Sequence, residues 1–135
     1  MGPDDALPSQ RVIQAGNARD INTVMDFYAS DSVYDLSSVG MGTFEGRTAI
    51  RSLFEDWWGS FEEYEQKAEE TRNLGNGVTF SIIVMRGKPP HSSAWVEQRY
   101  AAVAIWTDGL IERTANIFDI DEARAAAERL AEERG

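Results

Sequence analysis

The hydrophobic pattern of the chain changes its period near residue 61, which restricts it to folds that combine helices with a sheet. Before that point apolar residues recur at the helical spacing i, i+3, i+4 and i+7, as in Ile21, Val24, Met25 and Tyr28. After it, the segment VTFSIIVM at 78–85 has the β-branched composition of a buried strand. Helices first and strands later predict an α+β domain with helices on one face of a curved sheet.

Turn and capping residues give the boundaries of the expected elements. Gly75-Asn76-Gly77 and Asp108-Gly109 predict hairpins, and Asp119 with Glu122 has the spacing of a capping box. We expect helices over 8–17, 20–28 and 47–61, and a last helix after residue 119. Strands are expected over 78–85, 94–107 and 110–118, with an extended stretch at 33–36. A loop is expected over 37–46, and residues 64–72 alternate only weakly. The prediction is one domain over 8–134 with four sequential antiparallel strands, and a flexible stretch at 1–7.

Charge and missing residue types exclude several classes of function. The 135 residues carry a formal net charge of −10, with 13 Lys plus Arg against 23 Asp plus Glu. Nucleic acids and anionic membranes need clustered cations, so neither is an expected partner. The chain has no Cys and a single His, His91, which leaves no basis for a thiolate or multi-histidine metal site. We expect no metal and no cofactor. Without a signal-peptide pattern or a long apolar run, the expected location is cytoplasmic.

Several short motifs occur in a characteristic order over residues 10–125. They are Asn17-Ala18-Arg19-Asp20, Phe27-Tyr28-Ala29-Ser30-Asp31, Tyr34, Phe44-Glu45-Gly46-Arg47 with Ala49-Ile50, Trp106-Thr107-Asp108-Gly109-Leu110-Ile111, and Phe118-Asp119-Ile120-Asp121. Through their order and spacing the chain resembles the SnoaL-like group of the NTF2-like superfamily, with its cystatin-like cone fold. The resemblance implies a strongly curved, mainly antiparallel sheet wrapped around N-terminal helices, a C-terminal helix, and an apolar pocket open at one end.

The family's range of functions leaves the activity open. Its members include ketosteroid isomerases, limonene-type epoxide hydrolases, scytalone dehydratase and polyketide cyclases, but also non-catalytic binding modules, so fold alone does not settle function. The resemblance also implies a homodimer through the open sheet face. Such an assembly would explain why the expected strand at 94–106 has apolar residues on both faces, namely Val96, Tyr100, Val103 and Ile105.

Most acid and base positions of these enzymes hold residues that do not exchange protons. By the resemblance, the isomerases' oxyanion-binding tyrosine falls at Val12 and their general base at Leu36. The Arg and two Asp of the epoxide hydrolases fall at Ile83, Met85 and Asn116. Scytalone dehydratase needs two His. These three chemistries are therefore not expected.

Tyr34 and Asn116 remain as polar candidates. The resemblance matches Tyr34 with a tyrosine that helps hold the catalytic water of epoxide hydrolases, and it implies that Asn116 faces the same position. A phenol and an amide can orient a water or a substrate oxygen. The alternative is a core aromatic and a buried amide bonded to backbone. Residues two apart share a strand face, so Glu112 is expected beside them. If buried, Glu112 could act as general acid or base; otherwise it is solvated.

The resemblance also puts Ala102 and Ala104 inside a pocket, together with Gln98 and Tyr100, whereas alternation from Asn116 adds Thr114 and Phe118. The other expected wall residues are Trp57, Phe61, Ile83 and Met85. A mostly aromatic wall with few polar groups is typical of small-molecule sites, although these aromatics could simply fill the cone. We expect a pocket for a small hydrophobic molecule, polyketide-, steroid- or terpenoid-like, with cofactor-free proton transfer, cyclisation or water addition as the candidate chemistry. A non-catalytic ligand-binding or protein-interaction module is the alternative.

Overall fold

The computed structural model describes residues 7–135, which form four α-helices, one short 3₁₀ helix (Ser37–Val39) and six strands. The helices are α1 (Leu7–Asn17), α2 (Ile21–Met25), α3 (Arg47–Gly59) and α4 (Ile120–Glu133). The strands are β1 (Tyr28–Leu36), β2 (Gly42–Glu45), β3 (Glu63–Gly75), β4 (Val78–Lys88), β5 (Val96–Thr107) and β6 (Leu110–Ile117). The stretch expected to be flexible, 1–7, lies outside the described residues except for Leu7, which begins α1. No helix in this described part is long and apolar enough to cross a membrane.

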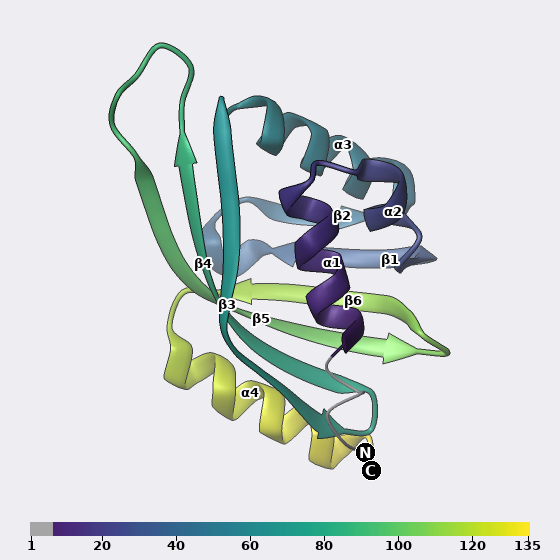
Figure 1. Ribbon diagram of the computed structural model, residues 1–135. Coiled ribbons are helices and arrows are strands. Elements are labelled where there is room, and N and C mark those ends of the chain that lie inside the picture. Colours follow the sequence, from purple (N-terminus) through teal and green to yellow (C-terminus); the bar gives the residue numbers. More distant parts are fainter. Residues whose placement is uncertain (1–6) are drawn as a thin grey trace.

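All six strands belong to one mixed sheet with the order β2-β1-β6-β5-β4-β3. Neighbouring strands are antiparallel except β1 and β6, which run parallel. Figure 1 shows the sheet curving, so that β3 and β4 run across the direction of β1 and β6. The prediction of four sequential antiparallel strands is confirmed for β3 to β6, and β1 and β2 extend the sheet beyond β6.

Two expectations in the first 46 residues are wrong. The helix expected over 20–28 ends at Met25, because the backbone N–H of Asp26 already closes the last turn onto Asn22 and Thr23. Tyr28 instead begins β1 and pairs with Ile111. The loop expected over 37–46 contains β2, a strand too short to show an alternating pattern, which folds back antiparallel onto β1.

Helices α1 to α3 cover the concave face of the sheet (Figure 1). Their apolar sides form a buried cluster with the strands in which Ile50 of α3 is completely buried and Val24 and Met25 of α2 nearly so. Phe54 stacks on Trp58 with ring centroids 5.8 Å apart. This cluster holds the helices at a fixed position over the sheet.

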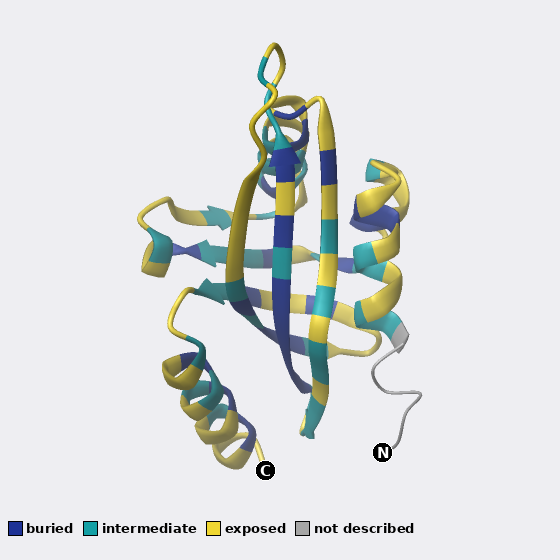
Figure 2. Cartoon of the chain, turned by 60° about the vertical axis from the view of Figure 1, so that its left-hand side comes forward, coloured by how far each residue is buried: buried dark blue, intermediate teal, exposed yellow. Residues whose placement is uncertain are grey.

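The C-terminal helix α4 packs on the opposite, convex face, contrary to the expectation of helices on one face only. Its alanines Ala123 and Ala127 are fully buried against Val78, Phe80 and neighbouring residues of β4 and β5. Small side chains allow this close approach, and Figure 2 shows buried and exposed stripes alternating along α4. The same cluster includes Val103, so α4 accounts for an apolar residue that the sequence had attributed to a dimer interface.

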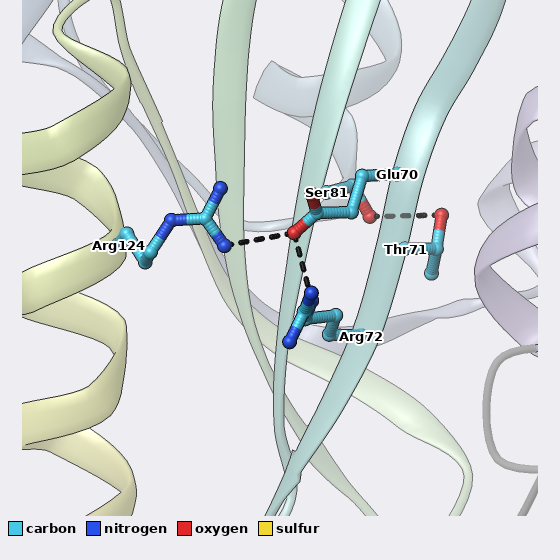
Figure 3. Close-up of polar contacts among 5 residues, drawn as sticks. All are labelled: Glu70, Thr71, Arg72, Ser81 and Arg124. Carbon is cyan, nitrogen blue, oxygen red and sulfur yellow. Dashed lines mark hydrogen bonds and ion pairs between the residues drawn. The ribbon is translucent and has the colours of Figure 1, made fainter.

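Polar contacts fix both the start and the middle of α4. The Asp119 carboxylate accepts a hydrogen bond from the backbone N–H of Glu122 at 3.0 Å, as the capping-box spacing predicts. Further along, Arg124 Nη1 lies 2.8 Å from Glu70 Oε2 of β3, and its guanidinium lies 4.8 Å from the centroid of the Phe80 ring. Figure 3 shows Arg72 on the same carboxylate. Arg124 of α4 thus links this helix, whose buried side is mostly alanine, to Glu70 of β3 and Phe80 of β4.

Candidate functional site

A cavity of about 340 Å³ lies between the N-terminal helices and the concave face of the sheet. Its wall comes from all three N-terminal helices and from every strand except β2, and most of it is aromatic or aliphatic. Seven of the expected wall residues line it: Trp57, Ile83, Met85, Gln98, Tyr100, Thr114 and Phe118. Ala102 and Ala104 do so as well, because alternate residues of β5 face inward.

Tyr34 and Asn116 meet in this wall through the parallel pairing of their strands. Tyr34 of β1 lies opposite Thr114 of β6, and Asn116 follows two residues later on the same face. Asn116 Nδ2 donates a hydrogen bond to the Tyr34 hydroxyl at 3.2 Å. The other amide atom, Asn116 Oδ1, is buried and bonded to no described residue. The structure therefore brings this predicted pair together, with an acceptor still free.

Glu112 lies outside the cavity, contrary to the strand alternation. Ile105 pairs with Arg113 whereas Trp106 pairs with Ile111, so Glu112 is the extra residue of a β-bulge. The bulge reverses the alternation and turns Ile111 inward in its place. Glu112 is exposed and accepts a hydrogen bond from the Thr107 hydroxyl at 3.2 Å. The burial that would make it an acid or base is absent.

Phe61, which was expected in the cavity wall, does not line the cavity but packs against the wall residues Trp57 and Tyr64. Its ring packs edge-on against Trp57 with centroids 5.4 Å apart and stacks on Tyr64 with centroids 5.7 Å apart. On its other side it covers Gly87 of β4, whose missing side chain makes room for the ring. The helix α3 ends at Gly59, two residues before Phe61, so the helical spacing used to place this ring does not apply.

Three further hydrogen bonds in the wall escaped the sequence reasoning. Trp57 Nε1 donates to the Tyr64 hydroxyl at 3.3 Å, Gln66 Nε2 to the Tyr100 hydroxyl at 2.9 Å, and Trp106 Nε1 to the Thr79 hydroxyl at 3.0 Å. Tyr64 and Gln66 belong to β3, where a bulge at Glu69 spoils the alternation that would have indicated an inward face. The inward position of Thr79 could have been inferred from Ile83, four residues along the same strand.

The ionisable groups that line the cavity within residues 7–135 are the four tyrosines, Tyr28, Tyr34, Tyr64 and Tyr100. Burial raises the pKa of each phenol above its ordinary value of 10.0. For Tyr34, the hydrogen bond from Asn116 opposes that rise in pKa but does not cancel it. At neutral pH these groups are therefore uncharged and act as hydrogen-bond donors rather than as bases.

Apart from Asn116, the positions that the resemblance associates with acids and bases face the cavity but are apolar. Val12, Leu36, Ile83 and Met85 all line the cavity. A carboxylate lies close in sequence at Asp35, but it bonds to Ser37 and to Arg113 instead, the latter at 2.8 Å. Among the described residues no group of three His, Asp or Glu is placed to hold a metal ion. The wall is suited to binding and orienting a neutral molecule.

A curved sheet wrapped around N-terminal helices, with a cavity on its concave side, defines a protein of the cystatin-like, NTF2-like cone fold. Within this class the chain belongs to the SnoaL-like domain family, whose family model matches residues 9–114. No curated protein matches the sequence.

Solved structures share the fold at low sequence identity. An uncharacterised cystatin-fold protein from Novosphingobium aromaticivorans is 17% identical with a TM-score of 0.73, and the alignment covers 84% of this chain and 97% of that one. An LEH-like epoxide hydrolase from Mycobacterium tuberculosis is 18% identical with a TM-score of 0.72, and the alignment covers 93% of this chain and 90% of that one. Rv0760c of M. tuberculosis, solved with estradiol-17β-hemisuccinate, is 19% identical with a TM-score of 0.73 (87% and 95% covered). At these identities the likeness concerns the fold.

Proposed function

We propose that this protein binds a small, mostly apolar molecule in the cavity and that Tyr34 and Asn116 hold a polar group of that molecule. The observation that carries the proposal is the hydrogen-bonded Tyr34–Asn116 pair in a mostly apolar wall, with Asn116 Oδ1 bonded to no described residue. A volume of about 340 Å³ is in the range of small-molecule sites. A polyketide-, steroid- or terpenoid-like skeleton fits this chemistry, and a neighbour of the same fold was solved with a steroid derivative.

Binding is favoured over acid–base catalysis by the protonation state of the wall. The phenols stay neutral at pH 7, since burial raises the pKa of Tyr34. A neutral phenol polarises a ligand oxygen by donating a hydrogen bond, but it does not remove a proton from carbon.

A second candidate function is addition of water to a bound molecule. The specific observation in its favour is that Tyr34 and Asn116 come within 3.2 Å of each other, close enough for one water to contact both. In this case the pair orients the water, and Tyr34→Phe lowers turnover of a substrate. Unchanged turnover in Tyr34→Phe would exclude a role of this hydroxyl in the chemistry, and Glu112→Gln, whose side chain lies outside the cavity, is the control.

Native mass spectrometry of the purified protein, before and after organic extraction, tests the binding function. We expect a retained small molecule that extraction removes, and weaker retention in Asn116→Leu. Glu112→Gln is the matched control, because its side chain lies outside the cavity on the same strand. Retention that is equal in Asn116→Leu and wild type would contradict the assignment of the polar group to this pair.

A homodimer through the convex sheet face is part of the proposal. Helix α4 covers one part of that face, whereas Arg86, Glu97 and Arg99 lie in the other part and form ion pairs across strands. Light scattering coupled to size exclusion measures the mass directly. A mass twice that of the 15.1 kDa chain supports the dimer, and a mass equal to it contradicts the dimer.

A further inference from the structure

Four hydroxyl oxygens in the cavity wall share one arrangement: each accepts a hydrogen bond from a nitrogen of a neighbouring side chain. The pairs are Asn116 to Tyr34 at 3.2 Å, Trp57 to Tyr64 at 3.3 Å, Gln66 to Tyr100 at 2.9 Å and Trp106 to Thr79 at 3.0 Å. The donors come from α3, β3, β5 and β6, so the arrangement recurs around the cavity rather than at one corner.

Each of the three tyrosine hydroxyls keeps a hydrogen that no residue within 7–135 accepts. A hydroxyl carries one donor hydrogen besides its acceptor lone pairs, and the indole of Trp57 can only donate, so the Tyr64 oxygen must accept. None of the three tyrosine hydroxyls donates to another described residue. Tyr64 itself is 9% exposed. Buried donors without a partner cost free energy, so a bound molecule that accepts from them is favoured.

The phenols are also close enough to act on one molecule. Tyr34, Tyr64 and Tyr100 come from β1, β3 and β5, yet all three line the same cavity of about 340 Å³, so one bound molecule of that size faces all of them. Because burial raises the pKa of all three, they keep their hydrogens at neutral pH. The wall therefore offers several donors to one ligand.

We infer that the cavity takes a neutral molecule with at least two carbonyl-type oxygens, such as a diketone or a quinone, and that the hydroxyl hydrogens of Tyr34, Tyr64 and Tyr100 bind those oxygens. The inference rests on the proposed binding function and adds the chemical class of the ligand. A carboxylate would also accept these hydrogens. However, no Lys, Arg or His within residues 7–135 lines the cavity to compensate its charge, and burying an unpaired charge is costly.

Isothermal titration calorimetry with naphthalene and para-naphthoquinone tests this inference. The two probes share their ring skeleton and differ in two carbonyl oxygens, and the change in their affinity ratio between wild type and a Tyr→Phe variant reports the hydrogen bond of the missing hydroxyl. The chain has no Cys, so quinone addition to a thiol does not occur. We expect the quinone to bind at least ten-fold more tightly than naphthalene. Tyr34→Phe, Tyr64→Phe and Tyr100→Phe should each reduce that preference by about 2- to 12-fold, the value of one hydrogen bond.

Naphthalene binding is the control in each variant, because a Phe ring keeps the shape of the wall and an unfolded variant would bind neither probe. Glu112→Gln should keep the full preference. Equal affinity for the two probes, or a preference that survives in the triple Phe variant, would overturn the carbonyl inference while leaving binding itself intact. If neither probe binds and native mass spectrometry finds no retained molecule, the proposed function fails, and the inference fails with it.

Discussion

Replacing Gly87 with Ala tests the packing that supports the cavity from behind. A Cβ at this position would lie 2.5 Å from Cδ1, 2.6 Å from Cε1 and 2.9 Å from Cγ of the Phe61 ring. The ring cannot simply swing away, because it is packed against Trp57 and Tyr64. Overpacking of this kind costs about 1–3 kcal/mol. Ala is about 0.5–1 kcal/mol better than Gly within a strand. We therefore expect Gly87→Ala to lower the free energy of unfolding by about 1–2 kcal/mol.

Urea denaturation followed by tryptophan fluorescence measures this change in stability. Gly59→Ala is the matched control: a Cβ there meets nothing within 4 Å, so it should stabilise the protein by up to about 1 kcal/mol through helix propensity. In the double variant Gly87→Ala/Phe61→Leu, the smaller side chain relieves the clash. Its loss should therefore be smaller than the sum of the two single losses. A Gly87→Ala protein as stable as wild type would refute the reasoning.

Three further predictions concern α4 and the strand before it. Asp119→Ala removes the cap that accepts from Glu122 and should cost about 0.5–2 kcal/mol in urea unfolding; an unchanged midpoint would contradict a capping role. The hydrogen bond from Arg124, with its charge, holds the pKa of Glu70 below its ordinary value of 4.5. The lowered pKa stabilises the folded state fully at pH values above 4.5, and this stability is lost as the pH falls through the pKa of Glu70 in the folded protein. Glu70→Gln should therefore make the free energy of unfolding fall less steeply with acidification, and an equally steep fall would refute this. Glu112→Gln should leave ligand affinity unchanged in calorimetry, because the Glu112 side chain is exposed. A marked loss of affinity would show that Glu112 contributes to binding.

The sequence predicts those parts of the fold that depend on local signals. Short segments of sequence are enough to predict three features: the Asp119 cap, the Asp108-Gly109 hairpin and the buried strand through Ile83. The structure contains all three. The strand β2 could not be found, because four residues carry no measurable period. The parallel pairing of β1 with β6 has no local signal either, since it joins segments that only the complete sheet brings together.

The candidate site shows where alternation succeeds and where it stops. It indicates Thr114, which lines the cavity, whereas Ile83, Met85 and the hydrogen-bonded pair Tyr34 and Asn116 come from the resemblance. Alternation counted back from Asn116 misplaces Glu112, because the bulge at this residue interrupts the alternation and Ile111 faces inward instead. Such bulges depend on pairing with the neighbouring strand, which a single sequence does not display.

The pairing of the first strand with the last has a consequence for the order in which the protein assembles. Tyr34 and Asn116 are 82 positions apart, so closing this contact carries the entropy loss of a very long loop. On the ribosome, α1 to α3 and β1 emerge well before β6, with the apolar sides that later face the cavity still uncovered. During that interval the nascent chain is most exposed to misfolding and to capture by chaperones. Substitutions in β6 that slow its docking should therefore reduce the yield of soluble protein more than they reduce the stability of the finished fold.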